Sequence, residues 1–308
     1  MYDEEDSISL FFQRMDSVEK SLAAACVVDY VLINDGSSDN TWARLLETQR
    51  ARGNILLLDL SRRFGKEAAL TAGLDFAKGD AVVLIDADLQ DPPELIPKMV
   101  ALWQDGFEVV VGQRVDRSSD STAKRVTARW FYAVHNLLAD QRIPKNVGDF
   151  RLMDRKVVEA LKRLPETRRF MKGLFSWVGF RTASLDYVRP PRAAGKGKFA
   201  GWTMWNFALE GITSFSSVPL QLMGYVGAAV SLGAFIYGAY ILLRAATGTI
   251  ELPGYASLFV AIVFLGGLQL VGLGIIGQYL GGAYTETKRR PVYIVREISK
   301  DGDGSPSL

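Results

Sequence analysis

The stretch Val82–Glu94 reads V-V-L-I-D-A-D-L-Q-D-P-P-E. Val82 to Ile85 is a short apolar run typical of a buried strand, and carboxylates follow it at once. Asp86 and Asp88 are therefore expected at the carboxyl end of a strand, where open α/β sheets bind their ligands. After two prolines, Glu94 begins a predicted helix with an acid near its positive end.

Asp86, Asp88 and Gln90 offer hard oxygen donors and no soft ones. Such donors suit Mg²⁺ or Mn²⁺ held jointly with substrate phosphates, so a metal-bridged diphosphate is the first hypothesis. The alternative is that both aspartates only cap the following helix, and for an isolated Asp-x-Asp motif that alternative is favoured roughly three to one. The features of the rest of the chain favour the metal site instead.

Composition narrows the class of protein. The 308 residues can form one large or two modest domains, and the excess of apolar residues lies in the last third. Cys26 and His135 are the only residues of their types, which excludes a disulfide framework and a Cys/His zinc site. The net charge of +2 is too small to indicate nucleic-acid binding. No cleavable signal peptide is expected, because the first residues are acidic.

Apolar runs alternate with helical patterns through the first half of the chain. An opening helix carries Ile8, Phe11, Phe12 and Met15 at helical spacing. Strands are predicted at 27–33, 55–60, 82–85 and 108–111, with helices at 67–77 and 94–104. This alternation indicates a parallel, doubly wound sheet. Three successive strands end in polar loops, so we expect Asp35, Arg62 and Asp86 to line one crevice, although each residue alone also fits a turn, a cap or a solvated surface.

Two later features point to a membrane. Pro219 to Leu243 is an apolar span without a charge that reaches ~37 Å as a helix, and Tyr255 to Leu280 is a second. Basic residues flank the pair on both outer sides, so the soluble domain is expected on the cytoplasmic side. Segments 168–180 and 199–215 mix aromatic and basic residues, which suits a membrane interface or an ordinary core. Val292 to Ile298 is expected to return as an extended segment against the soluble domain.

Several motifs together carry a family resemblance. They are N-D-G-S-S-D-N-T at 34–41, S-R-R-F-G-K-E-A-A-L at 61–70, D-A-D-L-Q-D-P-P-E at 86–94, G-Q-R at 112–114 and G-D-F-R-L-M-D-R at 148–155. In this order, and followed by two apolar spans, they resemble the polyprenyl-phosphate glycosyltransferases. These are dolichyl-phosphate-mannose-synthase-like enzymes of the inverting GT-A fold, and the bacterial bactoprenol glucosyltransferases are the most similar subgroup. The resemblance covers nearly the whole chain.

The resemblance implies an α/β fold. A GT-A (Rossmann-like) catalytic domain at 1–165 would be followed by amphipathic interface helices at 166–217, two transmembrane helices at 218–281 and a cytoplasmic tail at 282–308. It also implies metal-dependent, inverting transfer of one sugar from a nucleotide-sugar donor to the phosphate of a polyprenol. Glucose from UDP-glucose and undecaprenyl phosphate are the expected substrates; galactose, N-acetylated sugars, mannose and a modified arabinose stay open. The expected place is the bacterial inner membrane, as a multi-pass homo-oligomer such as a tetramer.

The family's functional positions map onto this sequence by the same motifs. Asp149 matches the candidate catalytic base. The resemblance implies that Asp86, Asp88 and Gln90 bind the metal, Mg²⁺ or Mn²⁺. It implies that Arg117 and Arg125 bind the acceptor phosphate. The nucleotide sugar is assigned to Tyr2, Glu4, Ile33, Asp35, Asp86, Ala87, Asp88, Arg114, Arg192 and Lys198.

One departure and three rival interpretations remain. Family members begin with an apolar strand ending in a Pro-x-Tyr-Asn-Glu-Glu-like segment, whereas here Met1 directly precedes Tyr2. A chain that truly starts there is expected to bind donor weakly and to be less stable. A processive synthase would carry Gln-x-x-Arg-Trp, but Val126 stands in the Gln position. A nucleotidylyltransferase has no use for two spans, and a non-catalytic scaffold or lipid translocation partner is the alternative from another class.

Overall fold

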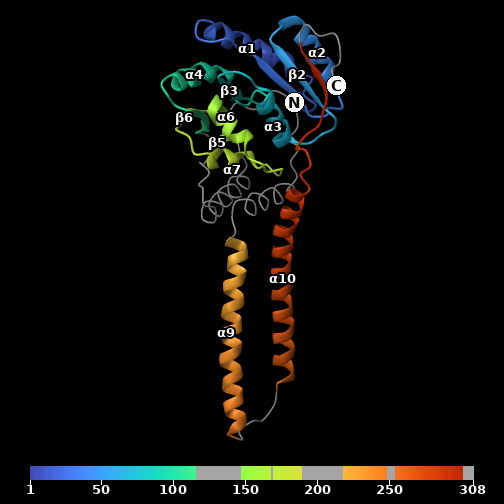
Figure 1. Ribbon diagram of the computed structural model, residues 1–308, viewed down its shortest axis with the longest axis vertical. Helices are drawn as coiled ribbons and strands as arrows, with labels where there is room; N and C mark the ends of the chain where they lie inside the picture. The colour runs from blue at the N-terminus through green and yellow to red at the C-terminus, as the bar shows by residue number, and fades with distance from the viewer. Residues whose placement is uncertain (116–146, 168, 189–217, 248–253, 301–308) are drawn as a thin grey trace.

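A computed structural model of the chain describes residues 1–115, 147–167, 169–188, 218–247 and 254–300. An α/β domain forms a head from which two long helices extend on the same side (Figure 1). The predicted ligand-binding residues Arg117, Arg125, Arg192 and Lys198 lie outside the described residues. Most of the predicted interface segment 166–217 also lies outside them.

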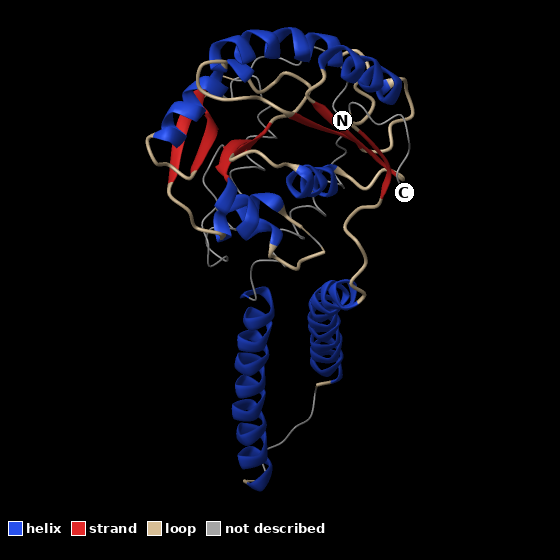
Figure 2. Ribbon diagram, turned by 45° about the horizontal axis from the view of Figure 1, so that its top comes forward, coloured by secondary structure: helices blue, strands red, loops and turns tan. Residues whose placement is uncertain are grey.

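The helices of the head lie on either side of its strands (Figure 2). They are α1 (Ile8–Leu22), α2 (Thr41–Arg52), α3 (Lys66–Phe76), the 3₁₀ turn η1 (Pro93–Leu95), α4 (Ile96–Gln104), α6 (Arg155–Lys162) and α7 (Met171–Trp177). The strands are β1 (Tyr30–Asn34), β2 (Ile55–Leu60), β3 (Ala81–Leu84), β4 (Val109–Arg114), β5 (Val147–Asp154), β6 (Thr182–Tyr187) and β7 (Val295–Ser299).

The described strands form two mixed sheets, in the orders β1-β2-β7 and β3-β5-β4-β6. The pair β1–β2 is parallel, as the alternation of strands and helices predicts, and β4–β6 is parallel too, although no strand was predicted at Thr182–Tyr187. Strands β5 and β7 run antiparallel to their neighbours, and β3 pairs only with β5, so the prediction of one parallel, doubly wound sheet is wrong in this respect. The extended return of Val292 to Ile298 against the soluble domain is confirmed by β7, which pairs with β2.

Local sequence explains why these elements form. In α1, the apolar residues at helical spacing, such as Ile8 and Phe11, are buried. Strand β2 lies between β1 and β7, and it is buried along nearly its whole length, with leucine and isoleucine at every position except Asp59. Helix α2 ends at Gly53, whose φ of 74° gives the left-handed cap that glycine adopts without strain.

The segment after Thr167 contributes to the core of the head. Helix α7 buries Met171, Leu174 and Phe175 in one apolar cluster with residues of β4 and β5. For these buried residues of α7 the core interpretation therefore holds. The assignment of 166–217 as a whole to a membrane interface stays a prediction.

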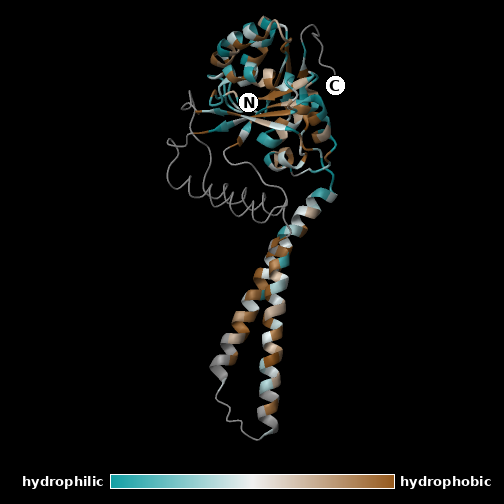
Figure 3. Cartoon of the chain, turned by 90° about the vertical axis from the view of Figure 1, so that its left-hand side faces the viewer, coloured by the Kyte–Doolittle hydropathy of each residue, from teal (hydrophilic) through white to brown (hydrophobic). Residues whose placement is uncertain are grey.

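Helices α9 (Val218–Ala246) and α10 (Tyr255–Thr287) contain the two predicted spans. Their apolar windows, Leu220–Tyr240 and Ala261–Thr287, are long enough to cross a membrane, and no part of either window is buried inside the protein. Figure 3 shows the mainly white and brown residues along both helices, against the mixed colours of the head. Because a core helix of a soluble protein would be buried, this exposure favours a lipid environment.

Candidate active site

Three loops meet at the carboxyl ends of β1, β2 and β3. The buried Asp35 carboxylate, directly after β1, accepts hydrogen bonds from the backbone N–H groups of Phe64 (2.7 Å) and Gly65 (2.9 Å) in the loop after β2. Lys66, which begins α3 directly after that loop, contacts Asp86 after β3. The predicted convergence of these loops is therefore confirmed, although Arg62 itself places its guanidinium over the ring of Phe64 (4.2 Å).

Gly36 allows the first two loops to approach each other. Its φ is +64°, and a Cβ atom there would lie 2.5 Å from both the Arg62 carbonyl carbon and the Arg63 backbone nitrogen. Any other residue would clash with backbone, which cannot rotate away as a side chain would. The turn in N-D-G-S-S therefore fixes how closely the Asp35 loop and the Arg62 loop pack.

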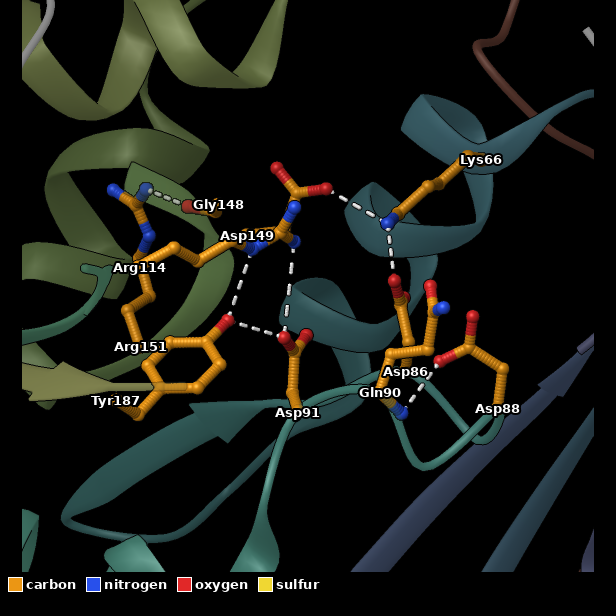
Figure 4. A network of polar contacts seen from close by, with 10 residues as sticks. All are labelled: Lys66, Asp86, Asp88, Gln90, Asp91, Arg114, Gly148, Asp149, Arg151 and Tyr187. Atoms are coloured by element: carbon orange, nitrogen blue, oxygen red, sulfur yellow. Dashed lines mark hydrogen bonds and ion pairs between the residues drawn. The ribbon is translucent and has the colours of Figure 1, made fainter. Parts of the chain in front are cut away.

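Lys66 bridges two carboxylates from distant parts of the chain (Figure 4). Its Nζ atom lies 2.7 Å from Asp86 Oδ2 and 2.7 Å from Asp149 Oδ2. Lys66 is the first residue of α3, Asp86 follows β3, and Asp149 lies on β5. One ammonium group thus joins the Asp-x-Asp loop to the residue predicted as the catalytic base.

The Asp-x-Asp loop has an unusual backbone. Leu89 has a φ of 56°, in the left-handed region, although it is buried and carries a side chain. Such a conformation is strained for leucine and persists where the surroundings impose it, often at functional sites. It accompanies a tight turn in which Asp88 Oδ1 accepts a hydrogen bond from the Gln90 N–H (3.1 Å), and Asp86, Asp88 and Gln90 gather on one side of the site (Figure 4).

The residues of this loop fit a divalent cation that is shared with a substrate. Asp86, Asp88 and Gln90 supply only oxygen donors, the kind that Mg²⁺ and Mn²⁺ prefer. In the part of the chain that the structure describes, no three His, Cys, Asp or Glu side chains form a complete metal site. An ion here would therefore take further ligands from phosphate oxygens or water, as Mg²⁺ does in phosphate-transfer sites.

A second polar network surrounds Asp91, at the end of the Asp-x-Asp loop. The hydroxyl of Tyr187 on β6 donates to the buried Asp91 carboxylate and accepts from Arg114 Nε (3.1 Å). Arg114 Nη2 lies 3.8 Å from Asp91. The network ties the end of the Asp-x-Asp loop to β4 and β6, and it holds the Arg114 guanidinium near Gly148, where an added Cβ would lie 3.1 Å from Nη2.

The charges around Asp149 set its protonation. Burial alone would raise the pKa of Asp149, but attraction to Lys66 and Lys172 outweighs burial and holds that pKa below its ordinary value. Burial and the nearby Asp149 charge raise the pKa of Glu67 to about 7, although Glu67 accepts a hydrogen bond from the Met171 N–H (3.1 Å). Asp149 is therefore ionised at neutral pH, while Glu67 is poised between its two forms.

Arg151 lies beside Asp149 on β5. It is buried, its guanidinium carbon lies 3.7 Å from the Phe175 ring centroid, and it donates to the Gly148 carbonyl oxygen (2.8 Å). Burial lowers its pKa to about 10, which leaves it a cation at neutral pH. This buried charge supports the backbone of β5 at Gly148 and Asp149.

The predicted nucleotide residues at the start of the chain lie against the Asp35 loop. The Met1 ammonium donates to the Ile33 carbonyl oxygen (2.6 Å), and the Glu4 N–H donates to Thr41 Oγ1 (2.9 Å). The Arg63 guanidinium lies 4.1 Å from the Tyr2 ring centroid. Tyr2, Glu4 and Ile33 are therefore near Asp35, while their contact with a nucleotide stays a prediction, as do the ligand-binding roles of the other predicted residues.

Sequence reasoning missed four residues of this site: Lys66, Asp91, Arg151 and Tyr187. Lys66, Asp91 and Arg151 stand inside the motifs that carry the family resemblance, so those motifs could have identified them as candidate site residues. Tyr187 belongs to a strand that carried no recognised motif, and only its contacts with Asp91 and Arg114 identify it.

The chain belongs to glycosyltransferase family 2, and it has the GT-A-like fold of such enzymes. The profile described as "Glycosyl transferase family 2" matches residues 11–162. A Synechocystis protein described as an uncharacterized glycosyltransferase is 47% identical, covering 97% of this chain and 93% of the relative. The prophage bactoprenol glucosyl transferase homolog of Escherichia coli K12 is also 47% identical, over 97% of both chains. Membership of family 2 makes the protein a glycosyltransferase. Its near-full-length similarity to relatives named bactoprenol glucosyl transferases supports the subgroup that its motifs resemble.

One solved structure similar to this chain is a mannosyltransferase from Pyrobaculum calidifontis in complex with GDP-Man and Mn²⁺. It is 18% identical, the match covers 93% of this chain and 84% of that one, and the TM-score is 0.46.

Proposed function

We propose that this protein transfers one glucosyl residue from UDP-glucose to the phosphate of undecaprenyl phosphate, with inversion at the anomeric carbon and with Mg²⁺ or Mn²⁺. The observation that carries the proposal is the Lys66 bridge, which joins the oxygen donors of the Asp-x-Asp loop to Asp149 in one site. The head that holds this site is joined to two helices of membrane length. The glucosyl and bactoprenol parts rest on similarity to relatives described as bactoprenol glucosyl transferases.

The leaving group would be a nucleoside diphosphate, so the site must neutralise charge as the glycosidic bond breaks. Asp86, Asp88 and Gln90 would hold the divalent ion, which supplies a positive charge to the diphosphate when bound. Arg114, kept in place by Tyr187, is a second positive group for the phosphates. Tyr2, Glu4, Ile33 and Asp35 remain our assignment for the base and ribose.

Asp149 has a role that its charge state helps to define. A phosphate monoester has a second pKa of about 6, so the acceptor is largely dianionic at neutral pH and needs no strong base. A carboxylate whose pKa is lowered is a weak base. We therefore assign Asp149 to stabilising positive charge at the anomeric carbon and positioning the reactants, more than to removing a proton.

Membrane orientation follows from the charges at the end of α10. Lys288, Arg289 and Arg290 stand where α10 meets the head. Basic residues favour the cytoplasmic side, so the head would face the cytoplasm of a bacterial inner membrane that both helices cross. The hydrophobic chain of the acceptor would then stay in the bilayer while its phosphate reaches the site. The homo-oligomeric state and the 1–165, 166–217, 218–281 and 282–308 division stay predictions.

The test is transfer from a panel of labelled UDP- and GDP-sugars into undecaprenyl phosphate, with Mn²⁺ or with EDTA. We expect one labelled lipid from UDP-glucose, and its loss with EDTA or in Asp88→Ala. Asp80→Ala is the matched control, because Asp80 is an exposed carboxylate at the opposite end of β3 and should retain activity. Transfer that survives both EDTA and Asp88→Ala would refute the metal assignment, and no product from any donor would favour the non-catalytic alternative.

A further inference from the structure

A cavity lies where α10 meets the head, and none of its described lining residues belongs to the Lys66 bridge. It has a volume of about 240 Å³ and is lined by Thr167, Thr285, Lys288, Arg290, Pro291 and Val292. These residues come from the segment before α7, from the last turns of α10 and from the chain that leads to β7. We call it the junction cavity.

The charge of the junction cavity is positive. Among the lining residues that the structure describes, Lys288 and Arg290 are cations and none is a carboxylate. Glu286, the acid on the same turn, is directed to Thr167. Its Oε2 atom accepts hydrogen bonds from the Thr167 N–H (2.9 Å) and from the Thr167 Oγ1 hydroxyl (2.8 Å). Within the described residues, no ion pair is recorded for Lys288 or Arg290, so both cations are available to an anion.

Several contacts shape the junction cavity. The Lys288 Nζ atom lies 4.2 Å from the Tyr284 ring centroid, a cation–π contact that restrains the side chain. Arg289 has a φ of 47°, which turns the chain sharply after α10, and the Glu286–Thr167 hydrogen bonds hold that turn against the head. The cations therefore stand on a turn that is fixed at both sides.

The position of the cavity identifies the class of ligand. The apolar window of α10 ends at Thr287, so the cavity begins where a spanning helix would leave the hydrocarbon layer and enter the headgroups. Basic pockets at this depth on the cytoplasmic side recognise anionic lipid headgroups. Its volume is below the roughly 300–1,000 Å³ of pockets that enclose drug-sized ligands, so it suits a headgroup whose acyl chains lie outside.

We propose that the junction cavity binds the headgroup phosphate of an anionic phospholipid, through Lys288 and Arg290. This inference rests on the part of the proposed function that places α10 across a membrane, and it adds a lipid distinct from the sugar acceptor. A bound headgroup would join α10 to the segment before α7 and so secure the head against the membrane surface.

The test measures lipid binding by the full chain in detergent, by native mass spectrometry during titration with phosphatidylglycerol or phosphatidylcholine. We expect saturable binding of phosphatidylglycerol that is about tenfold weaker in Arg290→Gln, because a hydrogen bond to a charged group is lost. Lys288→Gln should act in the same direction. Arg289→Gln is the matched control, since it removes an adjacent exposed cation that does not line the cavity, and it should change binding less than about twofold.

Other outcomes would overturn the proposal. Equal weakening by Arg289→Gln and Arg290→Gln would mean general attraction to basic residues, and equal binding of phosphatidylcholine would mean no selectivity for anionic lipid. Full displacement by inorganic phosphate would assign the cavity to a free anion, and full displacement by undecaprenyl phosphate would assign it to the acceptor. Sugar transfer in the absence of phosphatidylglycerol is measured separately, so that failure of the lipid site and failure of the proposed reaction are distinguishable.

Discussion

Replacing Lys66 with methionine removes the ammonium group that joins Asp86 to Asp149, and it keeps most of the side-chain length. Each lost contact is a hydrogen bond between charged groups, and such bonds contribute about 1.5–3 kcal/mol. Because the Lys66 side chain is 48% exposed, solvent screening reduces this, and we expect about 2 kcal/mol of lost organisation in the transition state. At about 1.4 kcal/mol per tenfold, kcat should fall about 30-fold.

The same substitution should change the pH dependence of transfer. Attraction to Lys66 is the largest of the effects that hold the Asp149 pKa below its ordinary value. Without Lys66 that pKa rises, so the ionised carboxylate is lost at a higher pH as the solution is acidified. The acidic limb of the pH–rate profile should therefore move upward, toward neutrality.

The assay measures the initial rate of transfer of labelled glucose from UDP-glucose to undecaprenyl phosphate. It covers about pH 5 to 8, because perturbed carboxylates and phosphate groups titrate in that range. Lys66→Arg keeps the charge and should retain most of the rate. Lys172→Met is the matched control, because Lys172 also attracts Asp149 but has no recorded hydrogen bond or ion pair with it among the described residues, and its kcat should fall less than about threefold. A Lys66→Met variant with wild-type kcat and an unmoved acidic limb would refute the positioning role of Lys66.

Three further substitutions test the packing around the site by thermal or urea unfolding. Gly36→Ala should destabilise the head by about 2 kcal/mol or more, because its Cβ would meet the Arg62 backbone at a left-handed φ; unchanged stability would refute that close approach. The pKa of Glu67 is raised to about 7 in the folded protein, so Glu67 binds more protons in the folded than in the unfolded state, and its contribution to stability falls as pH rises toward 7. Glu67→Gln should reduce this loss of unfolding free energy by about 1–2 kcal/mol. An unchanged dependence of the unfolding free energy on pH would contradict the raised pKa. Tyr187→Phe leaves the buried Asp91 without its hydroxyl donor and should cost about 1–3 kcal/mol, whereas a neutral effect would show that Arg114 suffices.

Patterns of neighbouring residues predicted most of the first half of the fold. Ile55–Leu60 is a strand with the predicted bounds, because its apolar run is long and flanked by polar residues. Strand β5 was not predicted, since Val147–Asp154 contains charged residues and becomes a strand only by pairing with β3 on one side and β4 on the other. Strand β6 likewise depends on its pairing with β4, a contact that local sequence does not contain.

The candidate site shows the same limit. Asp86, Asp88 and Asp149 were predicted as functional residues because they stand in recognisable motifs, and the structure places Asp86 and Asp149 on one ammonium group. Lys66 stands in a motif too, yet its partners lie on two other elements. Its role therefore follows only from the folded arrangement of α3, the loop after β3, and β5.

The strand that follows α10 has a consequence for the order in which the protein is made. Strand β7 completes the β1-β2-β7 sheet, and it pairs with β2 across the buried Leu57 and Leu58. Synthesis from the amino end means that β7 leaves the ribosome only after α9 and α10 have done so. The β1-β2-β7 sheet can therefore form only after both long helices have been made. In the proposed topology, the head would complete its packing when its anchor is already in the membrane.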